Sequence, residues 1–176
     1  MHLLTARLLA AMTAYDAGDA RRIHHFLKVY ALAAAIGRLE GLTPEQQRVL
    51  EAAALLHDIG IHPAERLYGH CAGPLQEQLG PSEAEALLQR LGGYSEEEVR
   101  RICFLIAHHH TYSHIDALDW QILVEADFLV NLYEDGEDAA AAGRVGERLF
   151  RTATGKRLLS DMLLAPAWNS QSPTAP

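Results

Sequence analysis

Helix-start signals recur along the chain, and few segments between them alternate polar and apolar residues as a β-strand does. Thr43 with Gln46 forms one capping box, and Ser95 with Glu98 forms another. Asp19 is a further N-cap, placed before a long amphipathic segment. Apolar residues after each cap recur every three to four positions, as on one face of an α-helix. The sequence therefore predicts an all-α fold.

The helices that this pattern predicts are separated by short turns and by one longer interruption. They cover about residues 3–15, 19–40, 43–60, 82–91, 95–110 and 120–133, with one or two shorter helices in 137–162. Proline and glycine punctuate residues 61–81, which predicts a long loop after the third helix. We expect residues 1–164 to form a single domain and residues 165–176, which contain three prolines, to form a flexible tail.

Composition excludes several classes of protein. Hydrophobic residues make up 49% of the chain, but aromatic residues only 7%, a balance that favours packed helices over a β-sandwich. The formal charge of −8 opposes binding to nucleic-acid polymers and to anionic membranes. No apolar run is long enough to span a membrane, and Arg7 interrupts the apolar N-terminus, unlike a signal peptide. Cys71 and Cys103 have no CxxC spacing, so a reducing cytoplasm is expected.

Ten histidines are many for a chain of this size, and three polar clusters interrupt helices that otherwise look buried. His57 and Asp58 end an apolar helix, where the helix dipole disfavours a carboxylate unless a cation is bound. Asp127 lies in another apolar segment, and its local pattern fits a metal ligand or the partner of an arginine or protonated histidine. His25 alone fits a hydrogen-bonded core residue. Only the combination indicates a metal site.

In this order, His25, the pair His57-Asp58 and Asp127 resemble the H…HD…D pattern of the HD-domain superfamily of metal-dependent phosphohydrolases. The stretch Leu-Ile-Ala-His-His at residues 105–109 resembles a histidine-bearing helix often present in that family. The resemblance implies a compact HD-domain helical bundle, with those four residues holding a divalent ion, and phosphoester hydrolysis as the reaction. Imidazole and carboxylate ligands suit Mn, Fe, Co, Ni, Zn or Mg ions.

Catalytic candidates are Asp58, His109 and His108. Helical periodicity places His109 on the inward face of its helix, where it is a candidate ligand of a second metal, proton donor or phosphate contact. His108 is the alternative. The other histidines outside the motif and the 61–81 segment are expected to be solvated: His2, His24, His110 and His114. Candidates for substrate binding are Arg22, Lys28, Arg66, His70 and Asn131.

Two departures from the family pattern limit what the resemblance implies. Ile61 stands where many HD phosphodiesterases have the lysine of HDxGK, and residues 82–88 lack a histidine, which favours one ion over two unless His70 supplies a ligand. We expect a small phosphorylated metabolite or nucleotide as substrate. A degenerate HD module that binds metal or nucleotide as a sensor or interaction domain is the alternative, and a metal buffer built on residues 108–110 is a third reading. Homodimer formation stays open.

Overall fold

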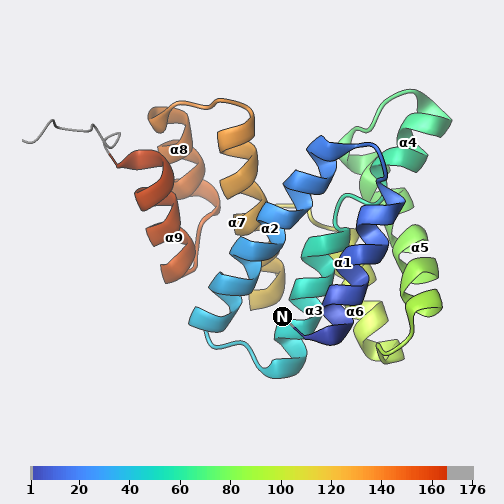
Figure 1. Ribbon diagram of the computed structural model, residues 1–176. Helices are drawn as coiled ribbons and strands as arrows, with labels where there is room; N and C mark the ends of the chain where they lie inside the picture. Colours follow the sequence, from blue (N-terminus) through green and yellow to red (C-terminus); the bar gives the residue numbers. More distant parts are fainter. Residues whose placement is uncertain (1, 166–176) are drawn as a thin grey trace, which may run out of the picture.

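The computed structural model describes residues 2–165, which form helices joined by short turns (Figure 1). This part of the chain contains nine α-helices, a closing π-helical turn and no strand, so the predicted all-α fold is confirmed. The elements are α1 (Leu3–Tyr15), α2 (Ala20–Leu39), α3 (Pro44–Leu56), α4 (Ile61–Tyr68), α5 (Gly73–Leu91), α6 (Glu96–Ile106), α7 (Leu118–Glu134), α8 (Ala139–Leu149), α9 (Ala153–Leu159) and η1 (Ser160–Leu164). The predicted tail lies outside the described residues, apart from Ala165.

The predicted caps begin their helices. In α3 the backbone N–H of Gln46 donates to the Thr43 hydroxyl at 3.2 Å, and the Gln46 side chain accepts from the Thr43 N–H at 3.0 Å. Ser95 and Glu98 make the same reciprocal pair at the start of α6. The Asp19 carboxylate caps α2. Each pair satisfies N–H groups that have no partner within the helix, so these helix starts are readable from the sequence.

The long loop predicted for residues 61–81 is wrong, because the structure forms α4 and most of the first half of α5 there. Pro63 and Pro74 lie in first turns, where a missing N–H costs no intrahelical hydrogen bond. Gly69 ends α4 in the left-handed conformation, with φ of 75°. Only Pro81 lies inside a helix, α5, at the cost of one such bond. The punctuation therefore marks helix ends, and the true loop is the short link at residues 69–72.

The core is centred on α3, which packs against α1, α2, α6 and α7 (Figure 1). Residues 49–56 of α3 are all buried, and so are residues 119–127 of α7. Burial on every side explains why these segments lack a clear polar face in the sequence. The C-terminal end of α3 thus brings His57 and Asp58 to the middle of the bundle.

Close backbone contact brings α5 against the turn that follows α3. A Cβ atom added at Gly60 would lie 2.6 Å from the carbonyl oxygen of Gln76, and one added at Gly80 would lie 2.7 Å from the Ile106 side chain. The two glycines therefore permit an approach that larger residues would block. This approach sets α5 beside the turn at residues 107–110.

The C-terminal helices form a separate layer at one end of the bundle, with α4 and α5 at the other end (Figure 1). Glu125 of α7 is fully buried and binds the start of α9. Its carboxylate accepts from the Thr152 hydroxyl at 2.5 Å and from the Thr152 N–H at 2.9 Å. Across residues 2–165, no helix is both long and apolar enough to cross a bilayer.

Candidate metal centre

The four predicted ligands come from α2, α7 and the turn after α3, and they lie close together in the bundle. Nε2 of His25 lies 3.2 Å from Nε2 of His57, 3.2 Å from Oδ1 of Asp127 and 3.5 Å from Oδ2 of Asp58. Nε2 of His57 lies 3.4 Å from Oδ2 of Asp58 and 3.6 Å from Oδ1 of Asp127. His57 is fully buried, and His25 and Asp127 are less than a tenth exposed. Ligand atoms of His25, His57 and Asp58 therefore all lie within 4.8 Å of one another, and Asp127 joins this group through its contacts with both histidines.

The other ring nitrogens of the two histidines have partners that orient them. Nδ1 of His57 lies 2.9 Å from the carbonyl oxygen of Ala54, which can only accept, so Nδ1 carries the proton in the neutral ring. Nδ1 of His25 lies 3.0 Å from Oε2 of Glu134. Both contacts leave the Nε2 lone pair of the neutral ring facing the pocket. Carbonyl and carboxylate partners of this kind are typical of metal-ligating histidines.

The electrostatics of the pocket also fit a cation. Burial disfavours the charged form of His57, but the carboxylates of Asp58 and Asp127 outweigh it and raise its pKa to about 9. Burial would raise the pKa of Asp127, yet its hydrogen bond with His25 holds the value below the usual range. The two carboxylates thus stay charged in the interior because positive charge is beside them. A divalent ion bound in place of the imidazole protons would supply this positive charge, and the donor set of two nitrogens and two oxygens suits such an ion.

A second group of ligand atoms shares Asp58. Its Oδ1 lies 3.6 Å from Nε2 of His109, and suitable atoms of Asp58, His109 and His110 all lie within 4.8 Å of one another. Nδ1 of His109 lies 2.7 Å from the carbonyl oxygen of Ile106. The buried Nε2 atoms of both histidines have no hydrogen-bond partner among the described residues. Buried imidazole nitrogens left in this state are suited to an electrophile such as a proton or a metal ion.

The predicted surface position of His110 is wrong. The α-helix ends at Ile106 and residues 107–110 form turns, so helical spacing no longer decides which side chains point inward. The backbone N–H of His110 donates to Oε1 of Glu77 on α5 at 3.0 Å, which fixes the turn. Burial, followed by the charge of His109, lowers the pKa of His110 to about 4 and keeps the ring neutral. The other three expected solvated histidines, His2, His24 and His114, are exposed.

The ring of His108 is packed elsewhere. It stacks on Phe104 with ring centroids 4.2 Å apart, and its Nδ1 lies 2.7 Å from the Phe104 carbonyl oxygen. The indole N–H of Trp120 donates to the His108 carbonyl oxygen at 3.0 Å. His108 makes no ion pair or hydrogen bond with the metal-ligand candidates in residues 2–165, whereas His109 faces Asp58. The inward position predicted for His109 is therefore the one that the geometry favours.

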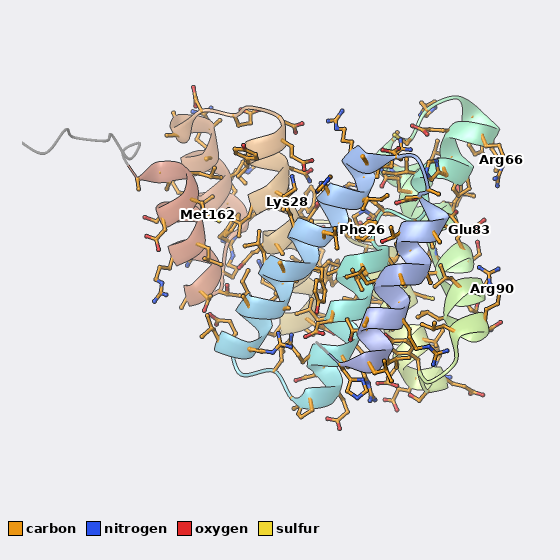
Figure 2. The ribbon with its side chains drawn as sticks, viewed as in Figure 1. Phe26, Lys28, Arg66, Glu83, Arg90 and Met162 are labelled. Carbon is orange, nitrogen blue, oxygen red and sulfur yellow. The ribbon has the colours of Figure 1, made fainter. Side chains whose placement is uncertain are left out.

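The five candidates for substrate binding occupy different surroundings. Asn131 donates to Oδ1 of Asp127 at 2.9 Å, and Lys28 pairs with Glu134, which holds His25. The remaining three form no hydrogen bond or ion pair with the four ligands in the part of the chain described: Arg22, Arg66 and His70. Arg22 is paired with Asp19 and Glu65, whereas Arg66 projects from α4 and His70 is exposed (Figure 2).

Two acidic residues lie beside the site; sequence reasoning missed Glu134 and gave Glu77 only as a residue of the 61–81 segment within reach of the pocket. Glu134 follows Asp127 by seven positions on α7, two helical turns, and a count of that spacing would have placed it on the same face. Glu77 lies in the segment that the sequence assigns to a loop, so no helical spacing pointed to it. Both residues act on histidines: Glu134 contacts the ring of His25, and Glu77 binds the backbone of His110.

The chain is thus an all-helical bundle with a histidine–aspartate cluster from α2, the turn after α3 and α7, a donor set that could hold a metal ion. The family model for the HD domain matches residues 22–141. The chain belongs to the HD-domain family. The crystal structure of a predicted HD superfamily hydrolase from an uncultured Thermotogales bacterium is similar, with a TM-score of 0.64 and 27% identity, over 89% of this chain and 83% of that one. Among curated proteins, none matches the chain.

Proposed function

We propose that this protein is a metal-dependent phosphohydrolase that acts on a small phosphorylated metabolite or nucleotide. The observation that carries the proposal is the clustering of His25, His57 and Asp58, which Asp127 joins through its contacts with both histidines. Membership of the HD-domain family and the likeness to a predicted HD superfamily hydrolase support it. The net charge of −8 favours a small substrate over a polyanionic polymer.

The residues of the pocket divide the work of such a reaction. A divalent ion, when bound, supplies Lewis-acid polarisation of a phosphoryl oxygen and acidifies water. His25 and His57 present neutral Nε2 atoms because Glu134 and the Ala54 carbonyl hold their Nδ1 atoms. Asp58 offers Oδ2 to this group and Oδ1 to His109. In the state with one ion, we assign His109 as donor of a proton to the departing oxygen: its Nδ1–H is held by the Ile106 carbonyl, and the proton transferred is one that Nε2 has first taken up beside Oδ1 of Asp58.

We propose one ion in the group of four ligands as the minimum functional state. The group of Asp58, His109 and His110 is where a second ion would be held, and the lack of hydrogen-bond partners at Nε2 of both histidines favours this position. Elemental analysis of untagged protein gives the ratio of metal to chain. If a second ion binds there, His110→Ala lowers that ratio by about one, whereas with one ion it leaves the ratio unchanged.

Two matched substitutions test the function. Asp58→Asn is expected to remove most bound metal and the hydrolysis of phosphomonoesters, diesters and nucleotides assayed with Mn²⁺, Fe²⁺ or Ni²⁺. His24→Ala, at the exposed neighbour of His25, is the control and should keep both. Full metal content and full turnover in the Asp58→Asn protein, with an unchanged melting temperature, would overturn the proposal.

The same panel addresses the alternative of an HD module that binds metal or nucleotide without turnover. Ile61, where many HD phosphodiesterases have lysine, is largely buried at the start of α4 and offers no cation to a phosphate. That observation is the one in favour of the alternative. Turnover of any substrate that depends on Asp58 excludes a purely passive role, and metal binding without turnover across the panel favours it.

A further inference from the structure

A groove separates α7 from α8 beside the metal centre. It consists of two adjoining hollows, of about 400 and 590 Å³, which share Phe128 of α7 and Val145 and Arg148 of α8 as lining residues. α8 packs chiefly against α9 and η1, and the groove lies in the space between α8 and α7. Figure 1 shows this layer of α8 and α9 next to α7 and α2.

Tyr112 connects the larger hollow to the metal centre. Its hydroxyl oxygen lies 3.3 Å from Nδ1 of His110, a residue of the second ligand group. Its ring meets Phe128 edge to face, with centroids 5.1 Å apart, and lines the hollow. In the smaller hollow, Asn131 lines the wall and donates to the ligand Asp127. Tyr112 and Asn131 therefore each line a hollow and contact a residue of the metal centre, so the groove is adjacent to that centre.

The larger hollow combines aromatic surface with a single charge. Its lining is Tyr112, Ser113, Phe128, Val145, Arg148 and Leu149. Arg148 forms no ion pair with any described carboxylate, although the chain has an excess of acidic residues. Arg148 lines both hollows, whereas Arg144 lines only the smaller one, where Asp135 and Glu137 are also present. An anion is thus favoured at Arg148, in the larger hollow.

Building on the phosphohydrolase function proposed above, we propose that the larger hollow binds the part of the substrate beyond the reacting phosphoryl group, and that this part carries a planar ring and a second anionic group. The ring packs against Tyr112, which is exposed, and against the uncovered part of the half-buried Phe128. The guanidinium of Arg148 binds the second anion, for which its planar set of donors is suited. A nucleoside diphosphate combines a reacting phosphoryl group, a second anionic group and a planar ring in one molecule.

The first test uses Arg148→Gln in the full-length, Mn²⁺-loaded protein and the non-hydrolysable probe α,β-methylene-ADP. We expect calorimetry to show binding about tenfold weaker than in the wild type, as for loss of one charge-assisted contact. Arg144→Gln, the same change one turn earlier on α8, should weaken binding less than twofold. Hydrolysis of glycerol 2-phosphate, which has neither a ring nor a second phosphate, should be unchanged in the control variant Arg144→Gln.

The second test separates the ring from the anion. Tyr112→Leu should weaken binding of α,β-methylene-ADP about tenfold but leave methylenediphosphonate, the same anion without a ring, unaffected. Tyr112→Phe keeps the ring and removes the hydroxyl, so it should restore binding of the nucleotide. Metal content is measured in each variant because Tyr112 touches His110.

These outcomes distinguish the groove from the hydrolase function. If Arg148→Gln and Arg144→Gln change the affinity for α,β-methylene-ADP equally, or if neither changes it, the proposal that the larger hollow binds substrate is refuted. Hydrolysis of glycerol 2-phosphate by the wild type would still support the hydrolase function. If the wild type binds no metal and hydrolyses nothing, the hydrolase function fails. Binding of α,β-methylene-ADP that depends on Arg148 but not on Arg144 would then still support the hollow as a nucleotide site.

Discussion

The contact between α5 and the turn after α3 predicts a specific cost for Gly60→Ala. Gly60 has φ of −72° and ψ of −11°, which any residue adopts, so the cost is steric and not conformational. The added Cβ would lie 2.6 Å from Gln76 O, 2.9 Å from Gly80 N and 3.0 Å from Gln76 Cα. All three are backbone atoms, which cannot rotate away, so α5 must move.

The size of the effect follows from two opposing contributions. Overpacking costs about 1–3 kcal/mol. Loss of glycine freedom in the unfolded chain returns about 0.4–1 kcal/mol. Because all three contacts are with backbone atoms, the upper part of the overpacking range applies, and we expect the unfolding free energy to fall by about 1–2.6 kcal/mol, which in a chain of this size lowers the melting temperature by about 2–10 °C. Because α5 carries Glu77, which holds His110, metal affinity should fall as well.

Gly143→Ala is the matched control for this measurement. Gly143 lies inside α8, and a Cβ added there meets nothing within 4 Å. The substitution should raise the unfolding free energy by about 0.5–1 kcal/mol, as alanine does for glycine in a helix. Thermal and urea unfolding of both variants is the assay. A Gly60→Ala protein as stable as the wild type, beside a stabilised Gly143→Ala protein, would refute the steric argument.

Three other predictions concern the carboxylates. Glu134→Gln should weaken metal binding about 10–100-fold, measured by competition with a chelator, because it loosens the ring of His25; unchanged affinity would count against an orienting role. Glu125→Ala leaves the N–H groups at the start of α9 unpaired and should lower the unfolding free energy, measured with urea, by about 2–4 kcal/mol. A decrease below about 1 kcal/mol would contradict this role of Glu125. Burial would raise the pKa of Glu98, but hydrogen bonds from the Ser95 cap and from Arg48 lower it below the usual value. The ionised Glu98 therefore stabilises the folded protein at pH values above its unfolded pKa, and this stabilisation is lost as the pH falls through the folded pKa. Stability measured from pH 7 to pH 3 should therefore decline less in Glu98→Gln than in the wild type.

The sequence predicted the helices whose ends are marked locally. Thr43 and Ser95 cap α3 and α6 through hydrogen bonds within four residues, so the sequence contains all the information. The loop predicted for residues 61–81 was wrong for a physical reason, since proline and glycine are compatible with helix termini as well as with loops. What decided between them was the packing of α5 on Gly60, a contact between segments that local rules do not see.

The ligand cluster was predictable as residue types but not as geometry. Asp127 was recognisable because a carboxylate in an apolar helix needs a compensating charge. The outward assignment of His110 failed because helical spacing was extended past Ile106, where the helix ends. Where a helix ends inside the bundle depends on its neighbours, here Glu77 of α5. The grouping of Tyr112 with Arg148 likewise depends on how α8 stands beside α7, which no local pattern encodes.

The scattered origin of the four ligands links ion supply to the survival of the fold. Residue 25 and residue 127 meet only when α2 and α7 are assembled, so the unfolded polypeptide cannot present the complete set. An ion that binds the native state alone stabilises it by mass action, by about 2.7 kcal/mol when the free ion exceeds its dissociation constant a hundredfold. Starvation for that ion would then shorten the lifetime of the folded molecule, and turnover by proteases would follow availability of the metal.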